Sequence, residues 1–181
     1  MSQVVIVGVD HFLQNLDAVC LTSSGREAEA AQKNALRSRL EELISTHGLE
    51  LLAEEAKLDR DCIGKQIADS HRCNHCNLTM SWDDRSKLGV SRDYDETPES
   101  RVAAYRIFEK YMFEEIQRKR GNAGSILVIC GSYHLPGLEK SFRDAGDDVY
   151  PEDTYDAEWY RGKPIESPGE AIRFYKDVYG R

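Results

Sequence analysis

Two short runs of β-branched residues, each followed by Gly-x-x-His, constrain the fold of this chain most strongly. "QVVIVGV" covers residues 3–9 and "SILVIC" covers residues 125–130, and each run is apolar enough to be a buried strand. The motif spans Gly8–His11 after the first run and Gly131–His134 after the second. A glycine lets the backbone turn out of a strand, and a histidine can bind a metal or carry a proton near neutral pH. The repetition therefore predicts two related strand ends.

Segments typical of helices separate these strands. Residues 26–48 are rich in helix formers and end at a glycine suited to a C-terminal cap. "LELLAEE" at 49–55 predicts another strand, and Thr97 before Pro98 predicts the start of a long helix that ends near Arg120. The inward stripe of this helix is expected to contain Val102, Tyr105, Phe108, Met112 and Ile116. Strands that alternate with helices indicate an α/β fold, with a mainly parallel sheet and helices on both faces.

Weaker patterns complete the predicted single domain of 181 residues. A helix is expected from about 59 to 70, and "HRCNHCN" at 71–77 is either a third strand or a loop. Residues 136–145 predict another helix, and "DDVY" after it predicts a last edge strand. The segment 151–181 contains three prolines and is expected to be an extended, partly helical tail packed on this domain.

The net negative charge of the chain argues against nucleic acids and anionic membranes as its main partners. Lys and Arg number 24 against 32 Asp and Glu, so the formal net charge is −8, whereas nucleic acids and anionic membranes require a basic face. No apolar run approaches the ~20 residues that cross a bilayer, and Met1–Gln3 lacks the basic start of a secretory signal. Five cysteines without disulfide-like spacing favour a reducing compartment. We therefore expect a cytoplasmic protein that acts on a small molecule.

Four ionisable residues are expected at one edge of the sheet. The carboxyl ends of parallel strands form the ligand-binding edge, so His11 and His134 should lie there together with Glu54 and Glu55. Because side chains alternate along a strand, only one of the two glutamates should point into a common site. A buried carboxylate favours a metal, an arginine or a proton as its companion. The plainer interpretation is two ordinary strand ends and an exposed acidic pair.

Two further groups have competing interpretations. Arg106 and Glu109 lie three residues apart on the predicted long helix, and this spacing favours a surface ion pair over a place in the site. The stretch 71–76 offers two histidines and two cysteines, but ligands from six consecutive residues would be strained. No second cysteine or histidine pair follows at a zinc-finger distance. We interpret these thiols as incidental.

"EKYMFEEIQRKRGNAGSILVICGSYHLPGLEKSFRDAGDDV" resembles the C-terminal signature of the TraB/TIKI group. This group belongs to a superfamily that also contains erythromycin esterase and the ChaN-like haem-binding proteins. The resemblance is carried by "GSYHLPGL" at 131–138, "GVDH" at 8–11, "AEE" at 53–55 and "RSKLGV" at 85–90. It is good over residues 105–149, fair over 4–14 and 49–55, and thin elsewhere.

The resemblance implies a metal-assisted or His/Glu-based hydrolytic site. His11 and His134 would be ligands or bases, and Glu54 or Glu55 would be a ligand or a general base. Glu55 would join the two histidines around a divalent metal ion, and Glu109 would be an acid or a supporting partner. Activated water would then attack the carbonyl carbon of a small ester or amide.

The resemblance also bears on substrate contacts. The family has adjacent Arg and Glu on the long helix, whereas Phe108 precedes Glu109 here, so Arg106 or Arg101 would take the arginine's role. Tyr133, inside the second Gly-x-x-His, would contact the substrate. The alternative to a hydrolase is a non-catalytic protein on the same scaffold that binds haem, another small ligand or a protein partner.

Overall fold

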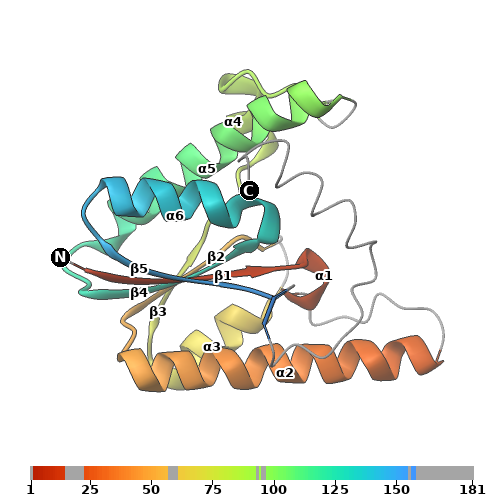
Figure 1. Ribbon diagram of the computed structural model, residues 1–181, viewed down its shortest axis with the longest axis vertical. Coiled ribbons are helices and arrows are strands. Elements are labelled where there is room, and N and C mark those ends of the chain that lie inside the picture. Colours follow the sequence, from red (N-terminus) through yellow and green to blue (C-terminus); the bar gives the residue numbers. More distant parts are fainter. Residues whose placement is uncertain are drawn as a thin grey trace.

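A computed structural model describes residues 2–14, 23–56, 61–92, 94, 97–154 and 156–157. The chain forms a single α/β domain around a five-stranded sheet in which every strand pair is parallel (Figure 1). The strand order is β3 (Asn74–Asn77), β2 (Leu51–Glu54), β4 (Ser125–Gly131), β1 (Gln3–Val9) and β5 (Asp148–Asp153). This architecture confirms the predicted fold class.

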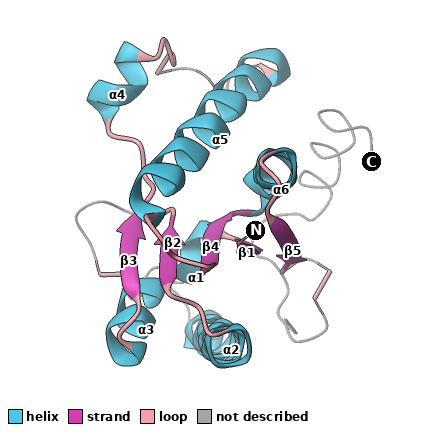
Figure 2. Cartoon of the chain, turned by 90° about the vertical axis from the view of Figure 1, so that its left-hand side faces the viewer, coloured by secondary structure: helices cyan, strands magenta, loops and turns pink. Residues whose placement is uncertain are grey.

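Helices cover both faces of the sheet (Figures 1 and 2). One face carries α2 (Ser23–His47) and α3 (Ile63–His71). The other carries α5 (Pro98–Arg120) and α6 (Leu135–Asp144), with the short α4 (Trp82–Lys87) beyond α5. The single turn α1 (His11–Gln14) follows β1, and the 3-10 turn η1 (Ser132–His134) joins β4 to α6. None of the helices in the described residues is long and apolar enough to cross a membrane.

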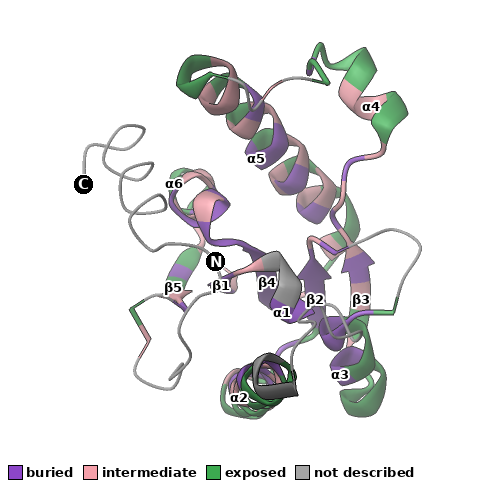
Figure 3. Cartoon of the chain, turned by 90° about the vertical axis from the view of Figure 1, so that its right-hand side faces the viewer, coloured by how far each residue is buried: buried purple, intermediate pink, exposed green. Residues whose placement is uncertain are grey.

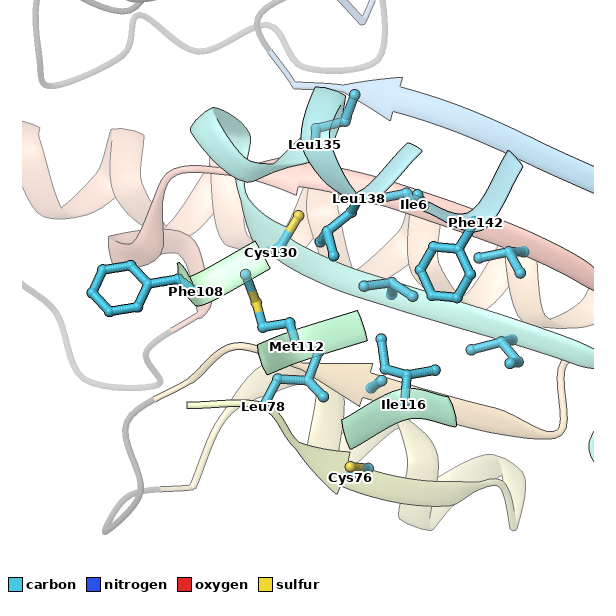
Figure 4. Packing of buried hydrophobic residues seen from close by; sticks show 14 of the residues in the cluster. Ile6, Cys76, Leu78, Phe108, Met112, Ile116, Cys130, Leu135, Leu138 and Phe142 are labelled. Atoms are coloured by element: carbon cyan, nitrogen blue, oxygen red, sulfur yellow. The ribbon is translucent and has the colours of Figure 1, made fainter. Parts of the chain in front are cut away.

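The core consists of two apolar layers, one on each side of the sheet. Ile6 and Val128 face α5 and α6, whereas Val5 and Leu127 face α2 and α3, because successive side chains of a strand point to opposite faces. With helices on both sides of it, every residue of β4 is buried (Figure 3). In Figure 4, Met112 and Ile116 of α5 lie close to Leu138 and Phe142 of α6, and Phe108 lies at the edge of this layer.

Local signals set several element boundaries. The Thr97 side chain accepts a hydrogen bond from the Ser100 backbone N–H, and Pro98 opens α5, so the predicted cap is confirmed. Gly48 follows α2 with a φ of +59°, a conformation that favours glycine. The start of α3 was predicted too early, because Cys62 retains an extended backbone. The ambiguous stretch at 71–77 contributes a strand, β3, which pairs with β2.

The edge strand β5 continues past the expected start of the tail. Pro151 lies opposite Ile6 of β1, within a strand that extends to Asp153. An edge strand tolerates proline because the missing N–H can face away from the neighbouring strand. The predicted packing of the tail concerns residues 158–181, which lie outside the described residues.

On each side of β4 the chain connections change from one face of the sheet to the other. The helices that follow β1 and β2 pack on the α2–α3 face, whereas α6, which follows β4, packs on the opposite face. Since β4 lies between β1 and β2, the chain diverges to opposite faces on both sides of its carboxyl end. In open parallel sheets such points are where ligands bind.

Candidate functional site

Glu54 and Glu55 point to opposite faces of the sheet. Oε1 of Glu54 accepts a hydrogen bond from the Gly64 backbone N–H at 3.4 Å, on the α3 side. Oε2 of Glu55 accepts a hydrogen bond from the Gly131 backbone N–H at 3.0 Å, at the end of β4. Its other oxygen lies 3.7 Å from Nε2 of His134. We predicted that only one of the two glutamates would point into a common site. In the structure Glu55 is the one that lies beside His134.

His134 lies between two carboxylates. Glu55 approaches Nε2, and Oε1 of Glu109 lies 3.5 Å from Nδ1 on the other side of the ring. The histidine is only 4% exposed and Glu109 only 6% exposed. Nδ1 is buried and makes no hydrogen bond in the described part of the chain, so its relation to Glu109 is an ionic contact. The three side chains come from the end of β2, from α5 and from η1.

The prediction of a surface ion pair between Glu109 and Arg106 is wrong. Glu109 is turned inward toward His134, and Arg106 is exposed. Their spacing on a helix permits a pair, but α5 packs on the sheet along the side that carries Glu109 and Phe108. Burial on the sheet therefore decided the direction of the Glu109 side chain.

The two carboxylates control the charge of His134. Burial by itself lowers the pKa of an imidazole, but the charges of Glu55 and Glu109 outweigh burial and raise the pKa of His134 above its ordinary value. The protonated form of His134 is therefore more stable in the folded protein than in a free imidazole. An imidazolium can give up a proton, and a neutral imidazole held between two carboxylates can accept one.

Two glycines, one inside the first Gly-x-x-His motif and one just after the second, leave room for this arrangement. A Cβ at Gly8 would lie 2.9 Å from Leu135 Cδ1 and 3.1 Å from the Ser132 Cα, so a larger residue would crowd the approach of β1 to η1. A Cβ at Gly137, three residues after His134, would overlap the carboxylate of Glu109. Gly137 ends the pattern Gly-x-x-His-x-x-Gly within the "GSYHLPGL" that carries the resemblance, and in the structure this position leaves space for a carboxylate.

Aromatic side chains complete the surroundings of His134. The ring of Tyr105 stands edge-on to the imidazole with centroids 4.7 Å apart, and Phe108 lies at 6.1 Å. Tyr133 packs against Tyr105 at 6.1 Å. Burial raises the pKa of Tyr105, so its hydroxyl stays neutral. The sequence placed Tyr105 only on an apolar stripe, because helical spacing does not distinguish a core residue from one beside a site.

The remaining predicted residues are not all brought to His134. Arg101 is half-buried and close enough to Tyr105 to act on its pKa. Arg106 instead lines a surface pocket of about 390 Å³ with Leu88, Ile107, Lys110, Tyr111 and Glu114. The backbone of His11 begins α1 directly after β1, but its side chain lies outside the described residues, so its convergence with His134 stays a prediction.

Glu54 belongs to a second cluster on the other face. Its Oε2 accepts a hydrogen bond from the Cys62 thiol at 2.7 Å and lies 3.4 Å from Nε2 of His75. Burial and the Glu54 charge raise the pKa of Cys62 to about 12, so this cysteine stays a thiol. His75 comes from the stretch interpreted as incidental. That interpretation missed it because Glu54 and Cys62 are distant in sequence and meet His75 only through strand pairing.

No family model matches the chain, no curated protein matches it, and no solved structure matches it. The resemblance to the TraB/TIKI group rests on the motifs quoted above.

Proposed function

We propose that the protein is a hydrolase of a small ester or amide, with His134 as the residue that transfers the proton. The observation that carries this proposal is the position of His134 between Glu55 and Glu109, at the carboxyl end of β4, where the connections diverge to opposite faces of the sheet. A histidine held by carboxylates is the arrangement that many hydrolases use for acid–base catalysis.

The two sides of the imidazole have different roles in this mechanism. The Glu55 side chain is 17% exposed and the Glu109 side chain 7%, so Nε2 faces the more open side. Nε2 takes a proton from water as the water oxygen attacks the carbonyl carbon. It then returns the proton to the leaving alkoxide or amine as the bond from the carbonyl carbon to that group breaks. Glu109 at Nδ1 stabilises the imidazolium in between.

The donors around Nε2 also fit a divalent metal ion. Imidazole nitrogen and carboxylate oxygen are common ligands of catalytic zinc, and His134 and Glu55 bring one of each to the same place. A carboxylate on the other ring nitrogen, as Glu109 is here, typically supports a metal-bound histidine. His134 and Glu55 would hold the ion, with His11 as the predicted third ligand. When bound, such an ion lowers the pKa of water.

The alternative of a haem-binding protein is less well supported by this geometry. Such a site needs an open apolar cleft beside an axial ligand, whereas His134 is 4% exposed and packed by Tyr105 and Phe108. A buried, charge-paired histidine favours proton transfer.

The test is hydrolysis of a panel of small chromogenic esters and amides, with and without added divalent ions. His134→Gln should lower kcat/KM by about 10²–10⁴-fold, the usual contribution of a general acid–base group. His71→Gln, at an exposed histidine of α3, should leave the rate unchanged. Full activity in His134→Gln, or no hydrolysis of any substrate by the wild type under either condition, would overturn the proposal.

A further inference from the structure

The second cluster is assembled from three separate elements on the α2–α3 face. Glu54 ends β2, Cys62 precedes α3, and His75 lies in β3 directly opposite Leu52 of β2. The pairing of β2 with β3 and the packing of α3 against both strands bring them together. One oxygen, one sulfur and one nitrogen lie within 4.8 Å of one another. This face is opposite to the one that carries His134.

Glu54 is held so that one of its oxygens is directed at the other two side chains. Oε1 accepts hydrogen bonds from the Gln14 side chain at 3.3 Å and from the Gly64 backbone N–H at 3.4 Å. Oε2 is left toward Cys62 and His75. A Cβ at Gly64 would overlap Oε2, so a glycine is required where α3 passes the carboxylate. Glu54 is completely buried, which is costly for a carboxylate unless a positive charge or a proton accompanies it.

His75 supplies an independent observation. Its Nε2 is buried and makes no hydrogen bond within the described ranges, although it faces Oε2 of Glu54 at 3.4 Å. Buried polar atoms nearly always make a hydrogen bond, so a buried ring nitrogen that makes none and faces a carboxylate and a thiol is suited to bind a cation. The side chain is 16% exposed, which gives an ion a route to the cluster from the β3 edge.

We propose that Glu54, Cys62 and His75 form a zinc-binding site, separate from the site at His134. Zinc is bound in proteins by thiolate, imidazole and carboxylate ligands, and this cluster offers one of each. Three protein ligands leave the fourth position of a tetrahedral ion for water. The inference goes beyond the proposed hydrolase and does not depend on it.

On zinc binding, Cys62 would release to solvent the thiol proton that now forms its hydrogen bond to Glu54, and the thiolate would bind the ion. With Zn–S near 2.3 Å and Zn–O near 2.0 Å, tetrahedral ligands lie roughly 3.5 Å apart. The contact between Sγ and Oε2 is now 2.7 Å, so these atoms move apart by less than about 1 Å as the proton leaves. Gln14 and Gly64 keep their hydrogen bonds to the other oxygen of Glu54 and fix its orientation.

Cobalt titration of the whole chain tests the site, because a thiolate-to-cobalt charge-transfer band reports cysteine ligation directly. The wild type should bind one equivalent of Co²⁺ with this band, and Zn²⁺ should displace it. Cys62→Ser should abolish the band, and His75→Gln should weaken cobalt binding by more than about 100-fold. Gln14→Ala, outside the donor set, should weaken it by about 10- to 100-fold, as changes to residues that orient a ligand usually do.

Matched controls separate this site from its neighbours. Cys73→Ser and Cys76→Ser alter cysteines beside His75 in the sequence and should leave the band intact. His134→Gln should also leave it intact, so failure of the hydrolase proposal would not affect this result. The inference is overturned if the wild type shows no thiolate band, or if the band survives in a folded Cys62→Ser protein.

Discussion

Gly137 and Glu109 meet where α6 crosses α5, and only a glycine leaves room there for the Glu109 carboxylate. The contact explains how a buried glutamate can lie beside His134 without displacing the first turn of α6. It also ties the third fixed position of Gly-x-x-His-x-x-Gly to the geometry of the histidine.

Gly137→Ala should therefore disturb the site and the fold together. The added methyl group collides with the carboxylate, and overpacking of this kind typically lowers the free energy of unfolding by about 1–3 kcal/mol. Urea unfolding monitored by circular dichroism measures the change. Gly124→Ala is the control, since its Cβ would meet its nearest neighbour, Glu50 Oε2, at an ordinary 3.9 Å. Equal stability of the two variants would contradict the steric argument.

The raised pKa of His134 predicts a pH-dependent contribution to stability. A group whose pKa is higher in the folded state stabilises fully below its unfolded pKa, near 6.5, and loses this contribution as pH rises through the folded pKa. For any such group, each pH unit by which its folded-state pKa exceeds its unfolded-state pKa adds about 1.4 kcal/mol to the free energy of unfolding at low pH. The difference in unfolding free energy between wild type and His134→Gln should thus shrink as the pH rises above about 6.5. A difference that grows over this range would show that the carboxylates do not hold the proton.

Glu109→Gln tests the role of this carboxylate in the proposed reaction. The change keeps the size of the side chain but removes the charge that helps to raise the pKa of His134. We expect kcat to fall by about 10-fold or more and the acid limb of the pH–rate profile to move to lower pH. A purely structural role would lower the amount of folded protein without moving the profile. Glu114→Gln, at an exposed position of α5, is the matched control.

Zinc should stabilise the folded protein if Cys62, His75 and Glu54 bind it. A ligand present at 100 times its Kd stabilises the native state by about 2.7 kcal/mol, which thermal unfolding detects as a higher Tm. The stabilisation should disappear in Cys62→Ser and persist in Cys73→Ser. Equal stabilisation of both variants would place the ion elsewhere on the chain.

Local patterns were sufficient to predict much of the secondary structure. The β-branched runs became β1 and β4, and Thr97 with Pro98 starts α5, because propensity and capping act between residues close in sequence. Alternating strands and helices also indicated the parallel sheet. The start of α3 was predicted too early, and the stretch at 71–77 was left open between a strand and a loop because β3 forms only by pairing with β2.

The site was predictable only in outline. Sequence patterns established that His134 and a glutamate follow strands of one sheet, because parallel strands bring their carboxyl ends to one edge. The folded chain was needed to show that Glu55 joins His134, that Glu109 turns inward, and that Glu54 meets Cys62 and His75 on the other face. These choices depend on strand order and on which side of a helix is buried. Both are set by packing between residues far apart in the chain, which no local pattern encodes.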